Sequence, residues 1–156
     1  MADRLTPAQR SANMARIRGK DTKPEIQVRR MLHALGYRFR LHRRDLPGRP
    51  DIVLPGRRAA ILVHGCFWHG HPGCRDCVIP ATRTEWWTAK IDGNRRRDAR
   101  NIRRLRGLGW SVTVVWECSL RRPDAVSRRL QRFLGPPGPL ARIGSTGAHS
   151  CAGAED

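Results

Sequence analysis

We base the fold prediction on residues 51–63, which read DIVLPGRRAAILV. Residues 52–54 form a short apolar run, residues 55–58 are typical of a turn, and residues 59–63 form a second apolar run. Two such runs around a short turn predict a β-hairpin. The second run is apolar throughout, which is typical of a strand covered on both faces.

The residues before the hairpin predict a helix and a further strand. Pro24 suits the first turn of a helix, and Thr22 with Glu25 has the spacing of a capping box. Gly36 marks the end of that helix. Residues 37–41 alternate between apolar and polar side chains and predict a strand.

The residues after the hairpin predict two more helices and one more strand. Residues 84–108 carry apolar residues at helical spacing, with Asp98 in the middle of the same stripe. Residues 110–116 are strongly β-forming, and residues 123–133 form a last helix. We therefore expect one α/β domain with a central sheet flanked by helices.

The two ends of the chain are expected to differ from this domain. Residues 11–17 could form a short helix. Residues 135–156 consist largely of Gly, Pro, Ser and Ala without apolar periodicity, so we expect a disordered tail and assign it no function. No internal repeat is apparent.

The composition favours a polyanionic partner. The 156 residues include 31 Lys and Arg but only 13 Asp and Glu, giving a net charge of +18, and nearly all the basic residues are arginine. Guanidinium groups suit phosphates and base edges. No segment has the roughly 20 apolar residues of a membrane span, and the first residues lack the apolar core of a secretory signal. We expect a cytoplasmic protein that does not bind membranes.

The cysteines predict a metal site. Their odd number, five, argues against a disulfide framework. Zinc prefers four sulfur or nitrogen ligands, which Cys66, His71, Cys74 and Cys118 would supply. Cys77 is an alternative to Cys74, because the two have a metal-ligand spacing, and the sequence leaves this choice open.

A second group of residues predicts hydrolytic chemistry. Asp51 stands at the entrance of the hairpin, where a carboxylate can hold a divalent cation that polarises a phosphate. The second strand of the hairpin leads to His64 and His69, either of which could serve as a base and as the partner of Asp98.

Aromatic residues near the cysteines are candidates for contacts with DNA bases. Phe67 and Trp68 lie in a glycine-flanked loop that is poorly suited to a core. Apolar wedges can enter a base stack, at least cost where the pair is already mismatched. Of Trp86 and Trp87, we expect one to pack and the other to reach DNA.

Two other functions remain open at this point. A zinc-stapled DNA-binding module without catalysis would need only the charge and the metal loop. A nuclease of the same fold could act on another DNA structure, such as a junction or a damaged base.

Several motifs together resemble the very short patch repair endonucleases over roughly residues 8–134. They include Ser11-x-Asn13-Met14, LPGRPD at residues 46–51, HGCFWH at 64–69, PATRTE at 80–85, and VWEC at 115–118. Lys90, Asn94 and Asp98 fall in the same order and spacing as in the family. The resemblance implies a restriction-endonuclease-like fold with a mixed sheet, a structural zinc and a catalytic Mg²⁺.

Members of that family nick the thymine strand of a T:G mismatch that arises when 5-methylcytosine deaminates. The resemblance thus implies duplex DNA with a mismatch as partner and nicking 5′ to the thymine. Downstream repair proteins are further possible partners, and the sequence leaves open which of them act before or after the nick. It also implies an N-terminal DNA-contacting arm at residues 1–20 and an endonuclease domain at 21–134. We expect a monomer, because the lesion is asymmetric.

The resemblance also implies a role for particular residues. Asp51 would bind magnesium and His69 would be the general base. Phe67, Trp68 and Trp87 resemble the intercalating wedge. The remaining roles implied by the family are support of the site (Glu25, His64, Asp98), contact near the mismatch (Met14, Lys90) and the zinc set (Cys66, His71, Cys74, Cys118).

One departure concerns the magnesium site. Val63 stands where a close relative has threonine. Valine serves equally if this position contributes its backbone carbonyl to magnesium, as we expect.

Overall fold

A computed structural model describes residues 6, 8, 9, 11, 12 and 19–138 of the chain. The tail from residue 139 onward and Met14 lie outside the described residues, as does most of the helix expected at 11–17, of which residues 11 and 12 are helical. No helix in the described part of the chain combines the length and the apolar character that a membrane span needs.

The hairpin and its neighbours form one mixed sheet of four strands in the order β1-β2-β3-β4. The strands are β1 (Arg40–Leu41), β2 (Ile52–Leu54), β3 (Ala59–His64) and β4 (Ser111–Trp116). The first three run antiparallel, and β4 pairs parallel with β3. The short 3₁₀ turn η1 (Pro55–Arg57) and a left-handed Arg58 close the hairpin, which confirms that prediction.

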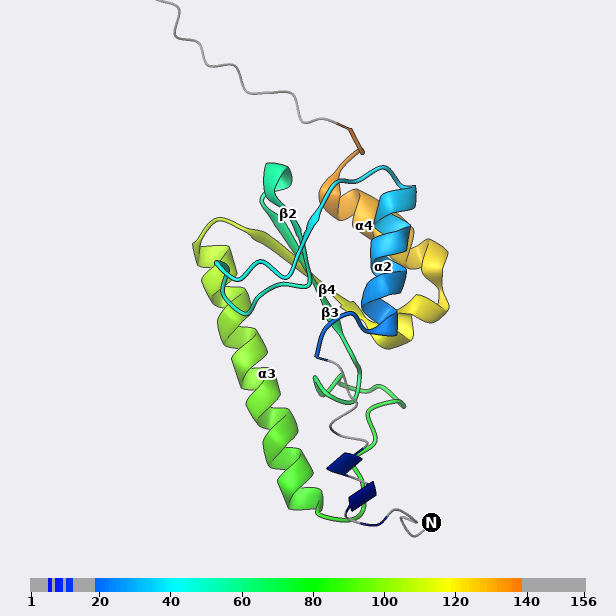
Figure 1. Cartoon of the computed structure of the whole chain (residues 1–156), viewed down its shortest axis with the longest axis vertical. Helices are drawn as coiled ribbons and strands as arrows, with labels where there is room; N and C mark the ends of the chain where they lie inside the picture. The colour runs from blue at the N-terminus through cyan, green and yellow to red at the C-terminus, as the bar shows by residue number, and fades with distance from the viewer. Residues whose placement is uncertain (1–5, 7, 10, 13–18, 139–156) are drawn as a thin grey trace, which may run out of the picture.

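Helices cover both faces of this sheet, as Figure 1 shows. The helix α3 (Thr84–Gly107) lies on one side, while α2 (Lys23–Ala34) and α4 (Pro123–Leu134) lie on the other. A 3₁₀ segment, η2 (Glu117–Arg121), joins β4 to α4. The three helices predicted between residues 22 and 134 are confirmed to within one or two residues at their ends.

The start of α2 follows the predicted capping box. The Thr22 hydroxyl accepts a hydrogen bond from the backbone N–H of Glu25 at 3.4 Å, and the Glu25 carboxylate accepts one from the N–H of Asp21 at 2.9 Å. Such caps contribute about 1 kcal/mol. Gly36, with φ of 86°, ends the helix as expected.

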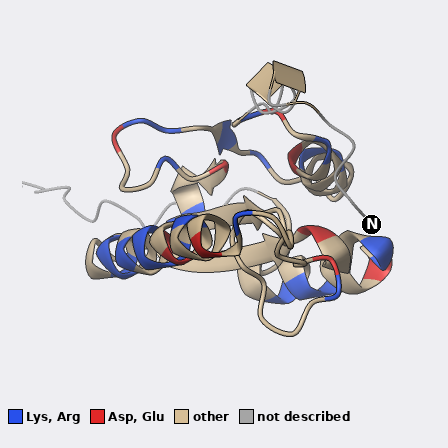
Figure 2. Ribbon diagram, turned by 90° about the horizontal axis from the view of Figure 1, so that it is seen from below, with Lys and Arg blue, Asp and Glu red and all other residues tan. Residues whose placement is uncertain are grey.

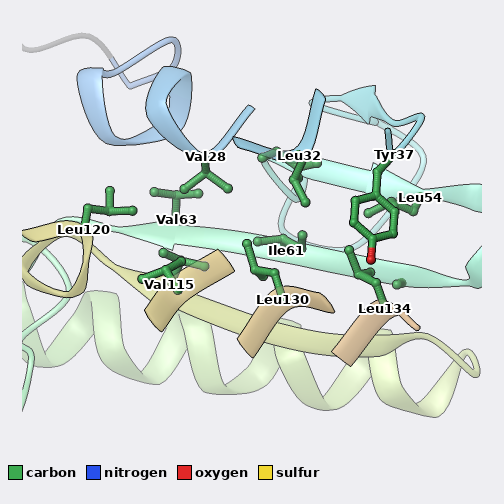
Figure 3. Packing of buried hydrophobic residues seen from close by; sticks show 13 residues of the cluster. Val28, Leu32, Tyr37, Leu54, Ile61, Val63, Val115, Leu120, Leu130 and Leu134 are labelled. Carbon is green, nitrogen blue, oxygen red and sulfur yellow. The ribbon is translucent and has the colours of Figure 1, made fainter. Parts of the chain in front are cut away.

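Alternation along the strands divides the apolar residues into two clusters. The larger one joins α2, α4 and one face of the sheet, and Figure 3 shows Leu32, Ile61 and Leu130 packed within it. The smaller one, under α3, contains Val53 and Leu105. Because residues alternate, Asp51, His64 and Trp116 belong to the strand positions that face α3.

The predicted strand at residues 37–41 is wrong in its extent, because only Arg40 and Leu41 pair with β2. Tyr37 is instead buried in the larger cluster, and its hydroxyl donates to the carbonyl of Gly135. At the other end, His42 has a φ of 46°, which turns the chain out of the sheet.

Candidate active site

A cleft of about 840 Å³ opens between α3, the end of β3 and the start of α2. Its lining includes Val63 and all five residues that the sequence predicts for catalysis: Glu25, Asp51, His64, His69 and Asp98. These residues lie up to 73 positions apart in the chain. The helix α3, which connects β3 to β4, brings Asp98 to the others.

Asp51 lines this cleft and lies just before β2. Its Oδ2 accepts a hydrogen bond of 2.7 Å from the backbone N–H of Val63, which ties it to the facing strand. Burial raises the pKa of Asp51 to about 6, and the nearby Glu25 charge adds to this effect. A half-buried carboxylate with a raised pKa is well suited to bind a cation, because the cation offsets the cost of its charge.

His69 and Asp98 form a close pair. The Nδ1–H of His69 donates to Asp98 Oδ2 at 2.6 Å, so Asp98 has His69 as its partner rather than His64. A proton held on Nδ1 leaves the Nε2 lone pair available to accept another proton. The pair therefore has the arrangement of an oriented general base.

His64 packs flat against His69. The two imidazole rings stack at 3.8 Å between centroids with an interplanar angle of 7°. Burial lowers the pKa of His64 to about 4, with the adjacent His69 lowering it further. His64 is therefore neutral near pH 7 and adds no charge beside the base.

Glu25 lines the cleft, but both of its oxygens are already used. Besides the Asp21 N–H, its carboxylate accepts from the Thr22 hydroxyl at 3.0 Å and from Arg29 Nη2 at 2.8 Å. The side chain is 3% exposed. Glu25 thus holds the start of α2 in place and acts on Asp51 through its charge.

The four expected zinc ligands come together beside the cleft. One ligand atom from each of Cys66, His71, Cys74 and Cys118 lies within 4.8 Å of all the others. The His71 Nδ1 is 3.5 Å from the Cys66 sulfur and 3.4 Å from the Cys118 sulfur. Ligands of a tetrahedral zinc are roughly 3.5 Å apart, so this set fits the ion. Cys77 lies outside the set, so the geometry favours Cys74 as the ligand.

The chemistry of these four residues also fits a cation. Burial and the neighbouring thiols raise the pKa of Cys66 to about 12. A thiolate at this position therefore costs free energy unless a bound cation compensates its charge. The ring of His71 stacks on Trp116 at 4.1 Å, and Trp116 in turn touches the edge of His64. Trp116 therefore connects the loop that carries the candidate zinc ligands to the imidazole of His64 in the cleft.

The candidate wedge residues form an aromatic cluster next to the metal loop. The ring of Phe67 lies 5.1 Å from that of Trp68 and 5.3 Å from that of Trp87, in edge-to-face contact. Trp86 is 49% exposed, with the Lys90 ammonium over its ring at 5.1 Å. Of the two neighbouring tryptophans, Trp87 packs into the cluster and Trp86 is the more exposed.

Sequence reasoning assigned no role to three further residues of this region. Asn94 donates a 2.9 Å hydrogen bond to the carbonyl of Trp68 and so anchors the aromatic loop to α3. Arg29, four residues after Glu25, could have been found from its helical spacing. His42 lies 3.6 Å from the Glu25 carboxylate, a contact that depends on the turn after β1 and has no local signal.

Comparison with known proteins supports one family for this chain. The family model of the DNA mismatch endonuclease Vsr matches residues 2–77. The type II nicking enzyme V.XorIIP of Xanthomonas oryzae pv. oryzae is 52% identical over 136 residues, which cover 87% of this chain and 99% of that protein. The DNA mismatch endonuclease Vsr of Escherichia coli is 43% identical and covers 97% of this chain and all of that protein.

A solved structure supports the predicted fold. The catalytic domain of the homing endonuclease I-Bth0305I matches with a TM-score of 0.51 and 22% identity, covering 72% of this chain and 94% of that one. This likeness confirms a restriction-endonuclease-like fold. With the two relatives above, it leads to one conclusion: the chain belongs to the Vsr family of DNA mismatch endonucleases.

Proposed function

We propose that the chain nicks duplex DNA 5′ to the thymine of a T:G mismatch by magnesium-assisted phosphodiester hydrolysis. The observation that carries the proposal is the cleft that a half-buried Asp51 and the hydrogen-bonded His69–Asp98 pair line together, with Trp68 of the aromatic cluster also in its lining. Two relatives that match most of this chain are named as a nicking enzyme and a DNA mismatch endonuclease.

Asp51 and the backbone carbonyl of Val63 would hold the magnesium, which would polarise the phosphate and stabilise the leaving oxygen. His69 takes a proton from the attacking water at Nε2. Asp98 keeps the ring oriented and stabilises its positive charge after the proton transfer. His64 stays neutral and keeps the base in position.

The cysteine cluster braces this site in the proposal. Zinc held by Cys66, His71, Cys74 and Cys118 would fasten the loop to the end of β4, leaving His69 free for catalysis. A closed set of four ligands suits a structural ion, because no position remains for water.

The aromatic cluster supplies recognition. Phe67, Trp68 and Trp87 would enter the stack at the weakened T:G step, with Lys90 and Met14 contacting the DNA nearby. We also propose that residues 1–20 act as a DNA-contacting arm for a monomeric endonuclease domain at 21–134. Met14 and most of that arm lie outside the described residues.

A catalytic function is favoured over a DNA-binding module without chemistry. A module that only binds DNA would have no use for Asp51 or for the 2.6 Å hydrogen bond between His69 and Asp98. Ionisable groups with strongly displaced pKa values, such as Asp51 and His64, gather at catalytic sites.

A nicking assay tests the proposal. Matched, T:G and branched duplexes of equal length are incubated with the zinc-loaded protein, with and without magnesium. We expect magnesium-dependent nicking of the T:G duplex alone, on the thymine strand. Absence of cutting on every duplex would overturn the enzymatic function, and preferential cutting of the branched duplex would overturn the mismatch assignment.

A further inference from the structure

The turn at residues 46–51 places an arginine at the mouth of the catalytic cleft in an unusual backbone conformation. Arg49 has a φ of 49°, in the left-handed region that side chains rarely adopt, and follows Gly48 with a φ of 73°. The N–H of Arg49 donates to the carbonyl of Leu46 at 3.1 Å and closes the turn. Non-glycine residues held in this way concentrate at functional sites.

The surroundings hold this turn in place. Leu46 is buried in the cluster under α3, and Pro50 is fully buried. Gly48 lies so close to α3 that an added Cβ would be 2.8 Å from Asn101 Nδ2. Arg49 is therefore presented from a rigid support, two residues before Asp51.

The guanidinium of Arg49 is not engaged by the protein. Arg49 is exposed and lines the same cleft as Asp51 and His69. Within residues 19–138, no hydrogen bond or ion pair of its side chain is formed, whereas nearby Arg29 binds Asp21 and Glu25. The Asp51 carboxylate accepts its hydrogen bond from the backbone N–H of Val63 and not from Arg49.

We propose that Arg49 binds the scissile phosphate and is a further catalytic residue of the nicking site. A guanidinium fork can contact two non-bridging oxygens of one phosphate, and Arg49 lines the same cleft as Asp51 and His69. The charge on those oxygens is redistributed in the transition state, so the contact accelerates the reaction as well as binding DNA. This inference rests on the proposed nicking function.

Single-turnover nicking of a T:G duplex by Arg49→Ala, Arg49→Gly and Arg49→Lys tests it. We expect the Ala and Gly variants to lose about 100-fold in rate equally. Glycine relieves the backbone conformation and alanine does not, so equal losses identify the side chain as the cause. Lysine keeps the charge without the fork and should restore only part of the rate. Arg103→Ala removes an exposed charge of α3 outside the cleft and should nick at the wild-type rate.

Binding measurements without magnesium locate the contact. Replacing the scissile phosphate by a neutral methylphosphonate should weaken binding by the wild-type protein but not by Arg49→Ala, because that contact is already lost. A wild-type nicking rate for Arg49→Ala, or a loss confined to binding affinity, would overturn the assignment. If the wild-type protein itself fails to nick, the proposed function fails instead, and the methylphosphonate comparison still tests the contact.

Discussion

Replacing the half-buried Asp51 by asparagine should stabilise the protein when magnesium is absent. Burial raises the pKa of Asp51 from 3.8 to about 6, so the folded state resists ionisation of this group. At roughly 1.4 kcal/mol for each pKa unit, the ionised carboxylate costs about 3 kcal/mol of folding free energy. Asparagine removes that cost and can still accept the hydrogen bond from Val63 N–H.

The sign of the pH dependence follows from the same values. Well below 3.8, the pKa in the unfolded state, the group is protonated in both states and costs nothing, whereas well above the folded-state pKa of about 6 it is ionised in both and the folded state carries the full cost. The advantage of Asp51→Asn should therefore be about 3 kcal/mol at pH 8 and about half of that at pH 5. At pH 8 this corresponds to a rise of roughly 6–12 °C in melting temperature for a chain of this size.

Thermal melting in magnesium-free buffer without a chelator, which leaves zinc in place, measures this difference. Added magnesium should then stabilise the wild-type protein and not the variant. Asp92→Asn is the control, because Asp92 is partly exposed and its nearest arginine is 3.9 Å away. Equal melting temperatures for wild type and Asp51→Asn at pH 8, or a less stable variant, would refute the reasoning.

Three further predictions concern the base, the zinc loop and the wedge. His69→Ala should lower single-turnover nicking by about 10²–10⁴-fold with T:G binding intact, and a smaller loss would remove His69 as the base. Cys118→Ser should lose zinc and melt at a lower temperature, whereas Cys77→Ser should keep one zinc per chain. Metal analysis measures the zinc content and circular dichroism the melting temperature. Loss of zinc from Cys77→Ser would contradict the proposed ligand set. Trp68→Ala should weaken binding of a T:G duplex by about 1–3 kcal/mol in fluorescence anisotropy, more than binding of the matched duplex. Equal weakening on both duplexes would speak against a wedge.

The hairpin and the helices could be predicted because their signals are local. Residues 52–54 and 59–63 are apolar around a turn, and Thr22 with Glu25 forms the capping box that its spacing indicates. The strand at residues 37–41 was overestimated because alternation does not reveal that Tyr37 is needed in the core. Packing of α4 against the sheet decides that point, and it is a long-range effect.

The sequence predicted which residues belong to the candidate site more completely than it predicted which of them contact one another. The periodicity of α3 identified Asp98 as a polar group in need of a partner, but only the folded loop selects His69. The choice of Cys74 over Cys77 likewise depends on where β4 delivers Cys118. Arg49 stands in the motif that carries the resemblance, yet its exposure over the cleft follows from a backbone conformation that spacing alone does not reveal.

Nicking by the Asp51→Ala variant, measured beside its affinity for the same T:G duplex, tests the central claim most directly. If an ion held by Asp51 performs the hydrolysis, the variant binds the mismatch almost as well as the wild-type protein but leaves the strand intact at every magnesium concentration. Undiminished cutting by the variant would contradict the account.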